Sequence, residues 1–150
     1  MSVSSVLVAV KGDPSDDEAV KLACQMVKPA KGKLYLLHVI EVDRGHPIDA
    51  EIGPATARGE EILKHVEQIA RPFKCDMEAE MVQARSFGSA VVQEAADREV
   101  DVIIIGLPYG ERYGSFSMGD TVPYVLKNAP CRVVIWREPP GDRSANAITP

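Results

Sequence analysis

Cysteine, basic charge and long apolar runs are all scarce in this sequence. Its three cysteines, Cys24, Cys75 and Cys131, are widely spaced and form no C-x-x-C pair, which excludes a disulfide framework or a zinc site. A net charge of −5 argues against a nucleic-acid-binding surface. No apolar run approaches the ~18 residues of a membrane span, and residues 1–5 lack the basic start of a secretory signal. We therefore expect a cytoplasmic protein.

The composition is that of one ordinary globular domain. The chain has 150 residues, 45% of them hydrophobic and 26% charged, which is enough to bury one core. From Pro139 onward the sequence is polar and rich in proline, with nothing to bury. We expect a domain over residues 1–138 and a flexible tail over 139–150.

Apolar strands and amphipathic helices alternate along the chain. Short apolar, β-branched runs predict buried strands, and they lie at residues 6–10, 34–40, 102–105 and 131–136, with a half-wet edge strand at 77–81. Apolar residues at helical spacing predict four helices, at residues 15–27, 55–71, from Ser86 or Gly88 to about 96, and 119–128. The order βαβαβαβαβ predicts a single-domain α/β fold, an open parallel five-stranded sheet with helices on both faces.

The first helix begins with a run of polar residues. Ser15 and Glu18 have the spacing of a capping box. Asp16, Asp17 and Glu18 suit the positive end of a helix dipole. A cation site is the less favoured interpretation of the same three carboxylates.

A ligand site is expected where two central strands end. In open α/β sheets, ligands bind beyond the carboxyl ends of the strands, where the winding direction reverses. The most apolar strands, 6–10 and 102–105, exit into residues 11–13 and into a loop over 106–118. That loop is about twice the usual length. It ends at Gly119, which opens a helix, where free N–H groups and the dipole favour an anion.

Four segments carry a resemblance to a known family: VLVAVKGDPSDDEAV, LYLLHVIEV, EAADREVDVIIIG and GDTVPYVLKNAPCRVVIW. Together they resemble the universal stress proteins over residues 4–137. The resemblance implies a Rossmann-like fold of the adenine nucleotide alpha hydrolase-like type, with strand order 3-2-1-4-5. It also implies a phosphate-binding pattern of Gly, two residues, Gly, nine residues, Gly, then Ser or Thr. Gly106 and Gly119 match the outer glycines of that pattern.

The resemblance implies a site for ATP or a related adenine nucleotide. Adenine would lie near Val10 and Val39, and phosphate near Gly106, Gly119 and Thr121. The complete set of candidate binding residues is Val10, Lys11, Gly12, Val39, Gly106, Gly110, Arg112, Gly119, Asp120 and Thr121.

Three residues depart from the family pattern. Lys11 replaces an Asp, Tyr109 takes the middle glycine position with Gly110 one place late, and Asp120 replaces the Ser or Thr. Two functions therefore stay open. One is a nucleotide-sensing regulatory dimer in a stress response. The other is a dimeric interaction module whose pocket is filled by its own side chains.

No catalytic set is evident in the sequence. No acid, base and nucleophile are matched, so we expect no enzyme, with slow ATP hydrolysis as a minor alternative. Ser117 is not a nucleophile elbow, since Ser115 stands where that motif needs glycine. His46 and His65 lack partners at metal-ligand spacing, and His38 is expected to be a hydrogen-bonded core residue.

The last strand predicts a contact with a second copy of the chain. Residues 131–136 carry no charge beyond Arg132 and would form an exposed sheet edge. An uncovered apolar edge promotes aggregation. This arrangement resembles that of the universal stress proteins, which form dimers through that strand. We expect a homodimer with contacts at Val133, Ile135 and Trp136.

Overall fold

The structure is a computed structural model that describes residues 2–112, 115–116 and 118–140. For residues 111, 112, 115 and 116, and so for the predicted site residue Arg112, it describes the backbone only. Ser117 and the tail from 141 to 150 lie outside the described residues. No helix in the described ranges is long and apolar enough to cross a membrane.

The chain alternates strands and helices, as predicted. The strands are β1 (Ser5–Val10), β2 (Lys33–Glu41), β3 (Asp76–Ala84), β4 (Val102–Leu107), β5 (Glu111–Arg112), β6 (Ser115–Phe116) and β7 (Arg132–Arg137). The helices are α1 (Ser15–Val27), α2 (Gly53–Ala70), the short 3₁₀ helix η1 (Arg71–Phe73), α3 (Phe87–Asp97) and α4 (Thr121–Asn128).

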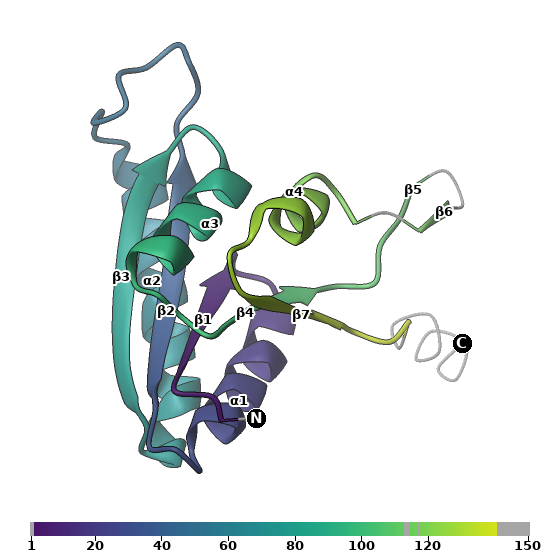
Figure 1. Ribbon diagram of the computed structural model, residues 1–150. Coiled ribbons are helices and arrows are strands. Elements are labelled where there is room, and N and C mark those ends of the chain that lie inside the picture. The colour runs from purple at the N-terminus through teal and green to yellow at the C-terminus, as the bar shows by residue number, and fades with distance from the viewer. Residues whose placement is uncertain (1, 113–114, 117, 141–150) are drawn as a thin grey trace, which may run out of the picture.

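Five strands form one parallel sheet in the order β3-β2-β1-β4-β7 (Figure 1). The prediction of an open sheet of order 3-2-1-4-5 is confirmed, with β7 as its fifth strand. The central strands β1 and β4 are buried almost throughout, because helices cover both of their faces. The winding direction reverses between these two strands, which places the expected binding edge at their carboxyl ends.

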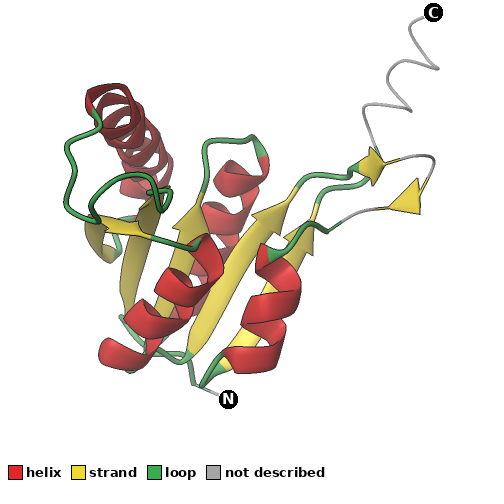
Figure 2. Ribbon diagram, turned by 90° about the horizontal axis from the view of Figure 1, so that it is seen from above, coloured by secondary structure: helices red, strands yellow, loops and turns green. Residues whose placement is uncertain are grey.

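Alternate side chains of each strand enter two separate cores, one on each face of the sheet. On one face Val6, Val8 and Val10 pack with α1 and α2. On the other face Leu7 and Ala9 pack with α3 and α4. Figure 2 shows the two helix layers on either side of the sheet.

Some element boundaries differ from the prediction. β3 extends to Ala84 instead of ending near residue 81, since Val82 and Ala84 still pack on the α3–α4 core. The expected loop after β4 contains a short antiparallel hairpin, β5–β6. In Figure 1 this hairpin projects away from the sheet beyond β4 and α4. The last helix begins at Thr121, two residues later than predicted.

The predicted capping box at α1 is wrong. The residue before the helix is Pro14, which makes no side-chain cap. Ser15 instead donates its backbone N–H to Asp13 Oδ1 at 2.9 Å, and its hydroxyl contacts the same oxygen. Glu18 pairs with Lys21, one turn further along the helix. The carboxylate of Asp13 therefore replaces Ser15 as the polar anchor of this turn.

Candidate functional site

The candidate site lies at the carboxyl edge of β1 and β4. The two strands are hydrogen-bonded neighbours, with Ala9 opposite Ile105. Lys11 and Gly12 leave β1 at the same edge where Gly106 and Leu107 end β4. Gly119, Asp120 and Thr121 open α4. The fold thus brings the ends of β1 and β4, which are far apart in the sequence, to one edge of the sheet.

The side chains of Val10 and Val39 do not share one pocket. Val10 packs in the α1–α2 core and Val39 in the α3–α4 core. Both are almost fully buried. Only their backbone or the strand ends beyond them could contact an adenine ring.

His38 occupies the end of β2 beside Val10. It is 9% exposed, and its Nδ1 lies 2.9 Å from the carbonyl oxygen of Val10. Because a carbonyl oxygen only accepts, Nδ1 carries the proton and donates. The prediction of a hydrogen-bonded core histidine is confirmed.

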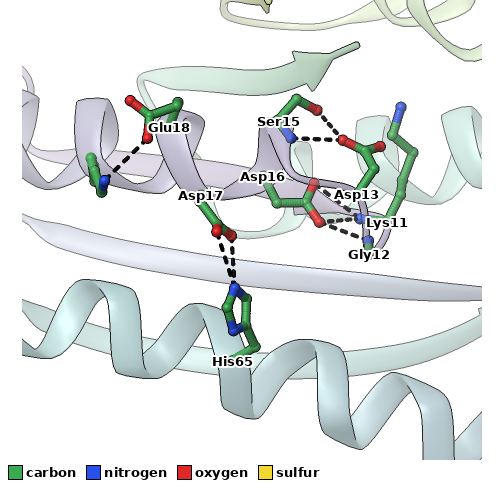
Figure 3. A network of polar contacts seen from close by, with 9 residues as sticks. Lys11, Gly12, Asp13, Ser15, Asp16, Asp17, Glu18 and His65 are labelled. Atoms are coloured by element: carbon green, nitrogen blue, oxygen red, sulfur yellow. Dashed lines mark hydrogen bonds and ion pairs between the residues drawn. The ribbon is translucent and has the colours of Figure 1, made fainter. Parts of the chain in front are cut away.

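Asp16 ties the exit of β1 to the start of α1. Its carboxylate is 2% exposed and accepts the N–H of Gly12 at 2.7 Å and that of Lys11 at 3.1 Å. Figure 3 shows this arrangement, with the Lys11 ammonium group pointing away from the carboxylate. Burial raises the pKa of Asp16 to about 6, although the two N–H donors oppose that shift.

The neighbouring carboxylates have partners of their own. Asp17 lies 2.9 Å from His65 Nε2 on α2, and Glu18 lies 3.1 Å from Lys21 (Figure 3). Asp16, Asp17 and Glu18 therefore diverge instead of forming one site. No group of three or more metal-ligating side chains gathers anywhere in the described part of the chain.

A cavity of about 310 Å³ opens beside Gly12, between α1 and α2. Of the predicted site residues, only Gly12 lines it; Arg58, Glu61 and His65 contribute from α2. The sequence analysis named Asp16 only as a helix-start carboxylate and did not predict its bonds to β1 or this cavity. The available signal was a carboxylate six residues after the end of a buried strand, close enough to reach back to it.

Gly106 and Gly119 are glycines for different reasons. A Cβ at Gly106 would lie 2.5 Å from the backbone oxygen of Ser15, so α1 rests directly on β4 there. Gly119 has φ +71°, and a Cβ there would meet no atom within 4 Å. Of the two, only Gly119 faces space that a ligand could enter.

The start of α4 offers fewer donors than an ordinary helix. The first turn of a helix has N–H groups without intrahelical acceptors, and here Thr121 and Val122 supply two of them. Pro123, the third residue, has no N–H. Asp120 is exposed and caps nothing with its side chain, so its carboxylate competes with an anion at this position.

Tyr109 lies where the family pattern has its middle glycine. Its ring is 5.1 Å from the guanidinium carbon of Arg137, at the end of β7, a cation–π contact. Gly110 follows it, half-buried. An aromatic side chain therefore lies against the end of β7, at the position where the family pattern has a glycine.

A test of the Asp16 carboxylate follows from its raised pKa. The folded protein binds this proton more tightly than the unfolded chain does, so the stabilisation is complete below about pH 4 and is lost as pH rises through 6. In Asp16→Asn this dependence is absent. We expect the difference in unfolding free energy, wild type minus variant, to fall by about 3 kcal/mol between pH 4 and 7. Urea denaturation across this range measures it, and a flat difference would contradict the assignment.

Comparisons with known proteins agree with this fold. The model of the universal stress protein family matches residues 3–137. No match was found among curated proteins. A universal stress protein from Archaeoglobus fulgidus in complex with dAMP superposes with a TM-score of 0.68 at 18% identity, covering 90% of this chain and 98% of that one.

Two further solved structures have the same fold. An Arabidopsis thaliana family member with AMP bound has a TM-score of 0.66 and 16% identity, over 93% of this chain and 94% of that one. A universal stress protein in complex with cAMP has a TM-score of 0.69 and 18% identity, over 91% and 98%.

Proposed function

Because the chain belongs to the universal stress protein family, we propose that it is a cytoplasmic, dimeric regulatory protein that binds an adenine nucleotide at the carboxyl edge of β1 and β4. The observation that carries the proposal is that β1 and β4 end side by side at the switch point of the sheet, where Lys11–Gly12 and Gly106–Leu107 lie. Structures of the same fold contain AMP, dAMP or cAMP.

The charges of the site favour the phosphate part of such a ligand. The Lys11 ammonium group points away from Asp16 (Figure 3) and is available to an anion. The start of α4 adds the N–H groups of Thr121 and Val122 and the open space at Gly119. Lys11 cannot accept a hydrogen bond from a ribose hydroxyl or an adenine amino group, as an Asp could. The adenosine part would therefore be held by backbone groups and apolar contacts.

We assign no catalytic turnover to this site. Among the described residues, the one hydroxyl that contacts a carboxylate here, Ser15 against Asp13, is buried beneath β4 at Gly106, where a substrate cannot reach it. Binding would instead order the segment between β4 and α4. A change in that segment alters the surface that the protein presents to a partner.

A second candidate function, an interaction module without nucleotide, is favoured by one contact. The Tyr109 ring packs on Arg137 at the end of β7, and an aromatic ring at the middle glycine position would narrow the space beyond β4 that a phosphate needs. If that space stays closed, the protein acts as a paired scaffold.

Ligand titration separates the two functions. Nucleotide at about 100 times its dissociation constant stabilises the folded state by about 2.7 kcal/mol, which raises the melting temperature by about 5–10 °C. We expect this shift with at least one of ATP, ADP, AMP and cyclic AMP, and excess absorbance at 260 nm in the purified protein. No shift with any of the four would leave only the interaction module.

The variant Gly119→Val tests where the ligand binds. Its branched side chain would fill the open space at the start of α4, so we expect nucleotide affinity to fall at least tenfold. Positive φ itself disfavours valine, and Gly119→Asn controls for this because asparagine tolerates that conformation. We expect Gly119→Asn to have the melting temperature of the wild type without ligand, and its affinity for nucleotide to fall as well. Full affinity in both variants would place the ligand elsewhere.

A further inference from the structure

Two cysteines far apart in the sequence meet at the other end of the molecule. Cys24 lies in α1 and Cys75 directly precedes β3, and their sulfur atoms are 3.6 Å apart. Figure 1 shows the ends of α1 and α2 and the start of β3 gathered at the lower edge of the sheet. This is the amino edge, opposite the nucleotide site. Both thiols are free.

The two thiols differ in access. Cys24 is completely buried in the α1–α2 core, whereas Cys75 is half-buried. Burial raises the pKa of Cys24 to about 12, and the neighbouring thiol adds to the shift. Cys75 is therefore the thiol that a reagent can reach from solvent.

Cys75 opens into a hollow of about 560 Å³. Three lysines line it, Lys28, Lys31 and Lys74, against a single carboxylate, Asp76. Among the described residues, none of these three ammonium groups takes part in an ion pair. Phe73 and Pro72 supply apolar walls. A hollow of this size accepts a small organic molecule, and its charge selects an anionic one.

We propose that Cys75 and Cys24 form a reversible redox pair that is oxidised by an anionic low-molecular-weight disulfide of the glutathione disulfide class, bound in the lysine-lined hollow. The Cys75 thiolate attacks one sulfur of that disulfide, whose S–S bond breaks and releases one thiolate. Cys24 then loses its proton to solvent and attacks the Cys75 sulfur, releasing the second thiolate. The protein loses two electrons and two protons, and the small disulfide becomes two thiols.

The order of the two steps follows from the burial of Cys24. The first step needs only the accessible thiol. The second needs a buried thiol to ionise, so it is slower and accelerates with pH. The mixed disulfide on Cys75 therefore accumulates before the protein disulfide forms.

The experiment treats the full reduced chain with glutathione disulfide and follows each cysteine by peptide mass mapping. We expect Cys75 to react at least tenfold faster than Cys131, and the product to be a Cys24–Cys75 disulfide. Cys24→Ser should stop at the mixed disulfide, and Cys75→Ser should leave Cys24 unreacted. Cys131 reacting as fast as Cys75, or Cys24→Ser giving the same product as wild type, would overturn the proposal.

The role of the hollow is tested by charge. Lys74→Glu should slow the reaction with glutathione disulfide several-fold and leave the reaction with the neutral disulfide of 2-mercaptoethanol unchanged. Lys127→Glu, the same change on α4, is the matched control and should alter neither rate. Equal rates for wild type and Lys74→Glu with glutathione disulfide would remove the hollow from the mechanism. A melting temperature within 2 °C of wild type, measured on the reduced form of each variant, would show that the variants fold.

Discussion

Gly106→Ala is expected to lower the free energy of unfolding by about 3 kcal/mol, although it adds a single methyl group. That methyl would lie 2.5 Å from the backbone oxygen of Ser15 and 2.9 Å from its Oγ. The oxygen belongs to the first residue of α1, so relief requires α1 or β4 to move, and overpacking of this kind costs 1–3 kcal/mol or more. Urea denaturation of the two proteins gives the difference.

Gly119→Ala is the matched control for that measurement. A Cβ at Gly119 meets no neighbouring atom, and the cost is that of placing alanine at φ +71°, roughly 1 kcal/mol. Both glycines belong to the same family pattern. Equal losses at the two positions would show that α1 does not press on β4 at Gly106.

Val133→Pro is expected to convert the proposed dimer into a folded monomer. Glu138 donates its N–H to Leu107 on β4. The backbone N–H groups of successive residues in a strand point to opposite edges. Those of Trp136 and Val134 therefore point to β4, as that of Glu138 does. The N–H groups of Val133 and Ile135 then point outward, and proline at such an edge position leaves the sheet intact.

The two edge strands of the sheet differ in their side chains, and this difference favours β7 as the dimer interface. β3, the other edge, presents Asp76, Glu78 and Glu80, charges that discourage strand pairing. β7 presents four half-buried apolar residues from Val133 to Trp136. Val133 and Ile135 also pack on the α3–α4 core of their own chain, so only part of each side chain is left for a partner.

Light scattering after size exclusion measures the outcome. Wild type should have twice the 16.3 kDa mass of the chain. Val133→Pro removes one hydrogen-bond donor from each protomer. Each loss leaves a carbonyl group of the partner unpaired, which costs about 1–3 kcal/mol. The two losses in a dimer therefore weaken association at least about tenfold. Val133→Ala retains the N–H and should stay dimeric. A dimeric Val133→Pro would place the interface elsewhere, and a dissociated Val133→Ala would point to side-chain packing instead.

The fold could be predicted because buried parallel strands leave a strong local signal. β1 and β4 are runs of β-branched and aliphatic residues, and each is followed by a glycine or proline turn. β3 was predicted too short because its last residues include Gln83, and pairing with β2 extends a strand beyond its apolar run. The β5–β6 hairpin has only two residues on each side, too few for a periodic pattern.

The candidate site was predicted in outline and missed in detail. Glycine spacing indicated Gly106 and Gly119, yet a spacing pattern cannot show that Ser15 rests on one of them. Leu126 is apolar and lies in α4, yet it is 53% exposed, because a helix of eight residues buries only a narrow face. The Cys24–Cys75 pair depends on a contact between α1 and the residue before β3, 51 positions apart, which no local pattern reports.

The bonds made by Asp16 fix half of the cleft in advance. The N–H groups of Lys11 and Gly12, just after β1, already donate to the Asp16 carboxylate. They are therefore not available to a phosphate, and the end of β1 is fixed before a ligand binds. Selection between ligands then depends on the segment that links β4 to α4. Exchanging that segment between family members is the direct way to transfer ligand preference.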